Sequence, residues 1–159
     1  MDSFDYVIPP EIKKIDGGEA MFLDSMQSQV ETYAKLKQGI MKKNEEAGMR
    51  HTKAEKKANE DARFVLPNAC CTRMILTMNA RSLLHLFELR CCARAQWEIR
   101  ELAEEMLKLV YPIAPNLFAN AGPGCVLNGT CHEGSMSCGK CESVKDKYRR
   151  MKYKLQNKN

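Results

Sequence analysis

The sequence predicts an α+β fold in which helices dominate and any sheet is short. Apolar residues recur every three or four positions over most of 19–47, 80–90 and 93–110, the spacing of amphipathic helices. Only residues 71–78 have the β-branched and apolar composition of a strand. A lone strand leaves its backbone hydrogen-bonding groups unpaired, so the chain borrows strands or lacks part of its own fold. We expect a short mixed or antiparallel sheet completed by partner chains.

The first long helix is expected from about Glu19 to Ala47. The breakers Pro9-Pro10 and Gly17-Gly18 precede it and leave room only for a short extended piece around residues 6–8. Gly48 is a plausible stop, because glycine readily adopts the left-handed conformation that ends helices. The apolar stripe of the expected helix consists of Phe22, Met26, Val30, Tyr33, Leu36 and Ile40.

Capping and breaking residues place the other elements. Thr52, with Glu55 three positions later, predicts a capping box that opens a short charged helix ending before Pro67. The strand candidate 71–78 follows, and Asn79 or Ser82 is expected to cap the next helix. The last long helix, about 93–110, has Ile99, Leu102, Met106 and Leu109 on one stripe and ends before Pro112 and Pro115. The sequence contains no internal repeat.

Length and composition exclude several classes of protein. The 159 residues are enough for about one domain, which argues against a large multidomain enzyme. With 44% hydrophobic and 28% charged residues, the chain resembles ordinary globular proteins. It contains no run of roughly 18 apolar residues, and its start lacks the basic and apolar regions of a secretory leader. We therefore expect a soluble cytoplasmic protein that does not bind membranes.

The net charge of +5 is concentrated at the C-terminal end. Residues 140–159 contain eight of the 25 Lys and Arg residues and two of the 20 acidic residues, so this tail carries +6 and the remainder −1. A basic tail can bind a polyanion, but a charge run is more often a solvated segment. Nucleic acid is therefore an unlikely partner.

Eight cysteines in a chain without a leader suggest reduced thiols. The adjacent pairs Cys70-Cys71 and Cys91-Cys92 each predict one buried and one half-exposed thiol. The remaining four are Cys125, Cys131, Cys138 and Cys141. Their last C-x2-C spacing, the neighbouring His132 and the surrounding glycines are compatible with structural zinc. Because the other spacings are not those of a standard finger, free or redox-labile thiols are the alternative.

Three blocks of sequence carry a resemblance to a known family. They are ARFVLP at 62–67, NARSLLHLFELR at 79–90 and AQWEIR at 95–100. In this order and at these separations they resemble the C-terminal half of the flavin-dependent thymidylate synthases, also called thymidylate synthase complementing proteins. The likeness covers roughly residues 5–120, and the Cys-rich tail also resembles extensions of some bacterial members. It predicts a family domain over 1–121, followed by a Cys-rich loop and basic tail over 122–159.

The N-terminal signature of that family, Arg-His-Arg followed by serines and Asn-Glu, has no counterpart here. The chain therefore resembles a truncated or split member, and we expect the missing half from another copy or a separate polypeptide. The resemblance implies a methyltransferase that converts dUMP to dTMP with FAD, NADPH and methylenetetrahydrofolate. It also implies homotetramers whose active sites form between subunits.

The resemblance assigns roles to six residues. Arg90 matches the arginine that contacts the uracil of dUMP, where a fixed cation stabilises negative charge developing during reduction. Arg63 matches an arginine that holds dUMP, plausibly at its phosphate. Asn79, Arg81 and His85 match positions that contact the flavin, and Leu89 is expected to be an apolar wall beside it.

Other interpretations of the same residues remain open at this stage. Arg63 and Arg90 are also ordinary cations near helix C-termini, and a lone histidine on a helix is often structural. Residues 96–98 are expected to serve packing. The alternative function is a non-catalytic, zinc-stapled helical module whose basic tail binds nucleic acid or acidic proteins, and a third possibility is a decayed gene product.

Overall fold

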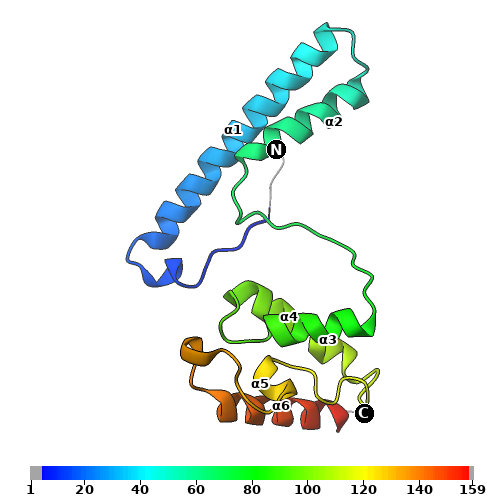
Figure 1. Cartoon of the computed structure of the whole chain (residues 1–159). Helices are drawn as coiled ribbons and strands as arrows, with labels where there is room; N and C mark the ends of the chain where they lie inside the picture. The colour runs from blue at the N-terminus through cyan, green and yellow to red at the C-terminus, as the bar shows by residue number, and fades with distance from the viewer. Residues whose placement is uncertain (1–4, 158–159) are drawn as a thin grey trace. The chain divides into compact units, whose positions relative to one another are not determined.

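The computed structural model describes residues 5–157, which form two compact units (Figure 1). The N-terminal unit is Met1–Ile75 and the C-terminal unit is Leu76–Asn159. The start of the expected N-terminal segment and the last lysine of the basic tail lie outside the described residues. None of the helices within 5–157 is long and apolar enough to cross a membrane.

The N-terminal unit is a hairpin of two helices, α1 (Gly18–Glu46) and α2 (His51–Ala62), which lie side by side in Figure 1. Ala54, Ala58 and Ala62 are fully buried at four-residue spacing on α2. Small side chains at this spacing let two helix backbones approach closely. Tyr33 of α1 is also buried, and its hydroxyl donates to Oδ1 of Asn59 at 3.2 Å. The hairpin is therefore held by a narrow seam rather than a broad core.

Glycines fix both ends of α1 much as the sequence predicts. Gly17 precedes the helix with a φ of 69°, and Gly48 follows it with a φ of 84°. Gly18 lies against the short 3-10 helix η1 (Ile12–Lys14), where a Cβ atom would stand 2.4 Å from the carbonyl oxygen of Ile12. No side chain larger than hydrogen fits there without moving the backbone.

The predicted capping box of α2 is wrong. The helix begins at His51, its N-cap is Arg50 without a side-chain cap, and Thr52 is already inside the first turn. Glu55 instead lies 3.6 Å from the ammonium of Lys37 on α1. The Glu55 carboxylate, which the local sequence assigns to the cap, thus pairs with the neighbouring helix instead. After α2, the 3-10 helix η2 (Arg63–Val65) leads into the extended segment.

Residues 71–78 do not form the predicted strand. The β-type pairing within 5–157 is a single antiparallel bridge between Tyr6 and Cys70, with the Cys71 amide donating to the carbonyl of Asp5 at 2.7 Å. Met74 and Ile75 are 73% and 98% exposed. A strand needs a neighbour along its whole length, and the described chain offers one only at residue 70. The helical part of the predicted fold is confirmed, whereas the described residues contain no completed sheet.

The C-terminal unit packs its helices around one core. It consists of α3 (Ala80–Arg90), α4 (Trp97–Val110), the short α5 (Gly124–Leu127), the 3-10 helix η3 (Gly134–Met136) and α6 (Cys141–Gln156). The buried cluster contains Phe87, Cys91, Ala103, Leu107, Tyr111, Phe118, Ala121 and Tyr148. α4 begins four residues later than predicted, because the Gln96 side chain accepts from the amides of Glu98 and Ile99 and caps it there.

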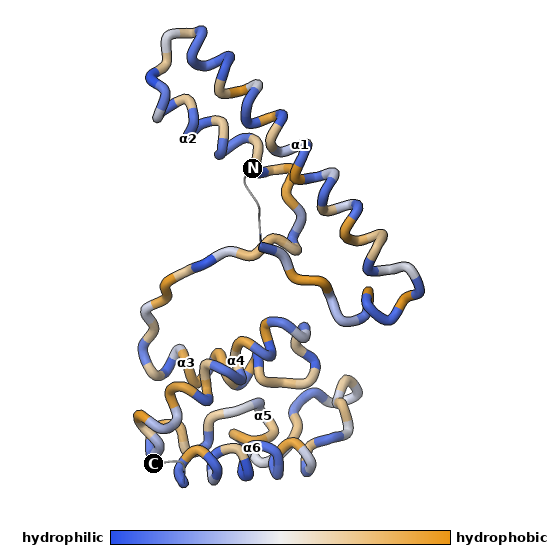
Figure 2. The backbone as a smooth tube through the Cα atoms, turned by 180° about the vertical axis from the view of Figure 1, so that it is seen from behind, coloured by the Kyte–Doolittle hydropathy of each residue, from blue (hydrophilic) through white to orange (hydrophobic). Residues whose placement is uncertain are grey.

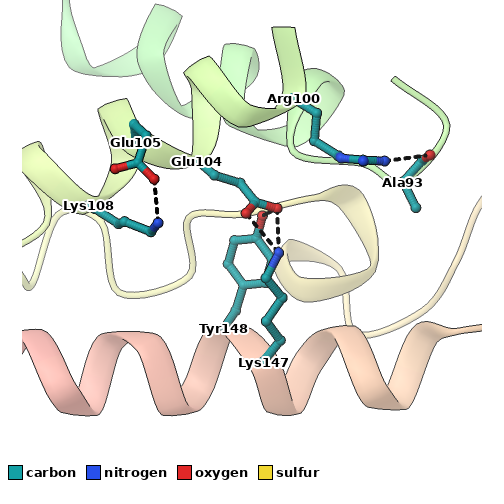
Figure 3. Close-up of polar contacts among 7 residues, drawn as sticks. All are labelled: Ala93, Arg100, Glu104, Glu105, Lys108, Lys147 and Tyr148. Carbon is teal, nitrogen blue, oxygen red and sulfur yellow. Dashed lines mark hydrogen bonds and ion pairs between the residues drawn. The ribbon is translucent and has the colours of Figure 1, made fainter. Parts of the chain in front are cut away.

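Most of the basic tail is a helix, α6, that belongs to this core. Alternating colours along α6 in Figure 2 reflect apolar residues among many charged ones. Tyr148 is 1% exposed, and its hydroxyl donates to Oε1 of Glu104 on α4 at 3.2 Å. The neighbouring Lys147 ammonium reaches the same carboxylate at 2.7 Å (Figure 3). Burial of one tyrosine and this shared carboxylate attach α6 to α4.

Lys152 of α6 is a buried cation with backbone partners. Its ammonium donates to the carbonyl oxygens of Ala119 at 2.8 Å and Ala121 at 2.6 Å. It also lies 5.9 Å from the ring centre of Tyr111. Burial lowers the pKa of Lys152 to about 8, with the nearby Cys91 opposing the shift. The side chain therefore ties α6 to the loop that follows α4, at the cost of removing a charge from water.

Stability should depend on pH through Lys152. Between pH 8 and the unfolded pKa of about 10.4, the unfolded chain holds the lysine proton that the folded chain has released. Raising the pH through this window therefore stabilises the folded chain, by at most about 1.4 kcal/mol per pH unit, and the gain is lost below pH 8. Urea unfolding of wild type and Lys152→Met at pH 7, 8 and 9 isolates this effect. The free energy of unfolding of the wild type should rise with pH relative to that of Lys152→Met, and a constant difference between the two would contradict the assignment.

Candidate functional site

Helix α3 and its N-cap hold five of the six residues that the resemblance assigns to ligand binding. It begins after Asn79, whose side-chain Oδ1 accepts from the Ser82 amide at 2.9 Å. This confirms Asn79 as the cap, and it means that its carbonyl oxygen already serves the helix. Its amide NH2 group remains a donor for a ligand. On the opposite side, Phe87 is fully buried and anchors α3 in the core.

Three of the predicted residues form a stripe along the exposed face of α3. Arg81, His85 and Leu89 are spaced four residues apart, so they lie one above the other on the same face. All three are exposed, and Leu89 is 50% accessible although it is apolar. Arg90, also exposed, lies one position further around the helix end. We call Arg81, His85, Leu89 and Arg90 the α3 stripe.

Neither arginine of the α3 stripe has a carboxylate partner among residues 5–157. His85 lies 3.7 Å from Oε2 of Glu88, whose other oxygen accepts from the Asn128 side-chain amide at 3.4 Å. Because the guanidinium groups of Arg81 and Arg90 are uncommitted, they are available to an anion or to the carbonyls of a planar ring. An exposed leucine between them offers an apolar contact. Such a surface suits a ligand that is both aromatic and negatively charged.

Arg63 belongs to the N-terminal unit, at the first position of η2. It is exposed and borders an open groove of about 400 Å³ on α2, which is also lined by Lys56, Asn59 and two glutamates. The groove carries both signs of charge, so it does not by itself favour an anion. The predicted dUMP ligands Arg63 and Arg90 are thus held by different units, and their roles stay predictions.

The adjacent cysteine pairs have unequal members. Cys91 is 3% exposed and Cys92 is half-buried, as predicted, whereas Cys70 is half-buried and Cys71 is exposed. Burial raises the pKa of Cys91 to about 11, although its interaction with the Tyr148 side chain opposes the shift. Because it is also almost inaccessible to solvent, Cys91 is an inert core residue at neutral pH.

The four tail cysteines line one pocket, but they do not form the predicted zinc site. Within residues 5–157, no three His, Cys, Asp or Glu side chains are grouped so that they could hold a metal ion. The Cys141 thiol is a hydrogen-bonding neighbour of the Cys125 thiol. The pKa of the Cys131 thiol is instead lowered by hydrogen bonding with the Ser137 side chain and the Glu133 backbone. Tetrahedral zinc needs four donors converging on one point, which this arrangement does not provide.

Sequence reasoning missed several residues around this pocket. Cys92 lines it together with the tail cysteines, and so do Glu88 and Leu89 of α3. Arg94 and Glu133, 39 positions apart, form an ion pair at its rim. No local pattern indicates that the end of α3 meets the Cys-rich loop, because the contact depends on how the unit packs.

Comparisons with known proteins agree with the resemblance. A family model described as thymidylate synthase complementing protein matches residues 1–116. A flavin-dependent thymidylate synthase of Clostridium tetani is 51% identical over 148 residues, covering 93% of this chain and 59% of that protein. Similarly named proteins of Geobacter sulfurreducens and Nitratidesulfovibrio vulgaris are 46% and 44% identical, with 94% and 86% of this chain and 57% and 53% of theirs covered.

The matched relatives are all named as flavin-dependent enzymes of thymidylate synthesis. The chain belongs to the thymidylate synthase complementing protein family. It spans a little over half the length of the curated relatives it matches. The Clostridium match is longer than the family model's 116 residues, so it extends into the Cys-rich segment.

Proposed function

We propose that this chain is part of a flavin-dependent thymidylate synthase and contributes residues that bind FAD and dUMP. The reaction is the reductive methylation of dUMP to dTMP with methylenetetrahydrofolate and NADPH. The observation that carries the proposal is the 44–51% identity to three proteins of that name over most of the chain. The comparisons give no support to the alternative of a zinc-stapled binding module.

The α3 stripe supports the proposal through its chemistry. Flavin and uracil are planar rings with carbonyl oxygens, and both ligands carry phosphate. Arg81 and the Asn79 amide would donate hydrogen bonds to the flavin, with His85 and Leu89 beside it. When bound, the flavin supplies the reducing hydride. Arg90 would hold the uracil and stabilise the negative charge that develops on it, which requires a fixed cation and no protein nucleophile.

The proposal also assigns roles to Arg63 and to the extended segment. Arg63 binds the phosphate of dUMP, since a guanidinium can donate two parallel hydrogen bonds to a phosphate. The exposed apolar residues within 71–79 pair with strands of partner chains to complete a sheet. The partner is a homo-oligomer, a tetramer by resemblance to the family, or a complex with a chain carrying the signature half.

The test is a titration of the purified full chain with FAD, with and without dUMP, followed by flavin absorbance and fluorescence. Saturable binding that dUMP strengthens is the expected result. His85→Ala should weaken FAD binding, and His51→Ala is the matched control, because both histidines are exposed and pair with a glutamate but only His85 lies on α3. Equal effects of the two substitutions, or binding that dUMP leaves unchanged, would count against the proposed site.

A further inference from the structure

One pocket of the C-terminal unit is lined by five cysteines. It has a volume of about 130 Å³, large enough for a few water molecules but not for a flavin. The thiols come from three places, which are the second residue after the end of α3, helix α5, and the loop that ends at the first residue of α6. They are Cys92, Cys125, Cys131, Cys138 and Cys141. Such a concentration of sulfur far exceeds what packing alone requires.

Two of these thiols are direct neighbours. Cys125 lies in α5 and Cys141 is the first residue of α6, and these two helices pack against each other. Burial and the neighbouring Cys141 thiol raise the pKa of Cys125 to about 11. Both are half-buried, so small reagents reach them, whereas Cys138 is exposed in the preceding loop. Two thiols that line the same pocket from two packed helices are close enough to interact, which favours them as the pair that a disulfide would join.

We propose that Cys125 and Cys141 are a redox-active dithiol that forms a reversible intramolecular disulfide by exchange with low-molecular-weight disulfides, such as oxidised glutathione. The inference does not depend on the proposed enzymatic function. It concerns thiols that lie outside the α3 stripe, and it explains why two cysteines are in contact where no metal-binding group is formed within residues 5–157.

The exchange balances without any further reagent. Cys141 is the attacking residue, because burial and its neighbour raise the pKa of Cys125 to about 11. The Cys141 thiolate attacks the external disulfide, whose S–S bond breaks and releases one small thiolate. The second protein thiolate then attacks the resulting mixed disulfide and releases the other small thiolate. The protein loses two electrons and two thiol protons, and the external disulfide becomes two small thiols. An excess of reduced small thiol reverses both steps.

The disulfide would affect α3, because α3 contacts both α5 and the pocket. Asn128, the residue after α5, donates to Glu88 of α3 at 3.4 Å, and Leu89 lines the same pocket. Cross-linking α5 to α6 would therefore restrict the elements that support the C-terminal end of α3. The closed loop contains Gly129, Gly134 and Gly139, all of which have positive φ angles. Closing it removes conformational freedom from the unfolded chain.

The test uses the full chain incubated in buffers of reduced and oxidised glutathione, followed by alkylation and mass spectrometry. Oxidation is expected to lower the mass by about 2 Da, protect two thiols and link the peptides containing residues 125 and 141. Cys125→Ser and Cys141→Ser should each abolish the link, whereas the matched controls Cys131→Ser and Cys138→Ser should retain it. A link between Cys138 and Cys141, or full alkylation of all eight thiols, would overturn the proposal.

Two further measurements test whether the variants are folded and whether the thiols bind a metal ion instead. The oxidised wild type should melt higher than the reduced form by roughly 5–10 °C, and Cys141→Ser should show no such difference. Metal analysis of the same samples completes the test. One equivalent of zinc that shields Cys125 and Cys141 from alkylation would also overturn the dithiol assignment.

Discussion

Phe87→Ala is expected to destabilise the C-terminal unit by about 4 kcal/mol, since large-to-small substitutions of buried aromatics cost roughly 3–5 kcal/mol. Phe87 is completely buried, and its ring meets Phe118 edge-on, with centroids 6.1 Å apart and planes at 70°. Removing it forfeits both the transfer free energy and this aromatic contact, and it leaves a cavity beneath α3.

Urea unfolding followed by circular dichroism measures this effect, with Leu109→Ala as the matched control. Leu109 is also a large apolar residue of the same unit, but it is 72% exposed on α4. Its replacement should change the free energy of unfolding by less than about 0.5 kcal/mol. A loss below about 1.5 kcal/mol for Phe87→Ala would mean that α3 is not anchored in the way described, and the α3 stripe would lose its rigid support.

The helices could be predicted because their signals are local. Spacing of apolar residues located α1, α3 and α4, and Asn79 was one of two candidate caps for α3. Both the strand and the capping box failed for the opposite reason, since pairing partners distant in sequence determine them. Residues 71–78 have strand composition without a neighbouring strand, and Glu55 is engaged by Lys37 rather than by its own helix end.

Helix α6 shows how composition alone misleads. Its run of Lys and Arg resembles a solvated tail, yet Tyr148 and the stem of Lys152 are buried in the core. The signal was present in the helical spacing of Val144, Tyr148 and Met151, which charge counting overlooks. A long cationic side chain can bury its apolar stem while its charged end finds carbonyl partners.

The candidate site was predictable residue by residue but not as a geometry. The resemblance named the α3 stripe, and the four-residue spacing of Arg81, His85 and Leu89 places them on one exposed face. That Glu88 would connect His85 to Asn128 depends on packing between α3 and α5. The contact of Cys125 with Cys141 was equally hidden, because a C-x2-C spacing draws attention to Cys138 as the partner of Cys141.

Arg90→Ala should reduce the strengthening of FAD binding by dUMP about 100-fold. A charge-assisted hydrogen bond contributes roughly 1.5–3 kcal/mol, and about 2.7 kcal/mol corresponds to a factor of 100 in affinity. Affinity for FAD alone should change little, because Arg90 is assigned to the uracil and not to the flavin. Arg90→Lys keeps the charge but loses the planar fork, so an intermediate effect is expected.

The matched comparisons for Arg90 come from the same unit. Arg81→Ala should weaken FAD binding itself, since Arg81 is assigned to the flavin. Arg100→Ala should leave both affinities unchanged, because its guanidinium already donates to the carbonyl of Ala93 at 3.1 Å (Figure 3). If Arg90→Ala and Arg100→Ala behave alike, Arg90 is an ordinary cation at the C-terminal end of a helix, where it interacts favourably with the helix dipole. If only Arg90→Ala removes the dUMP effect, the end of α3 is where the nucleotide binds.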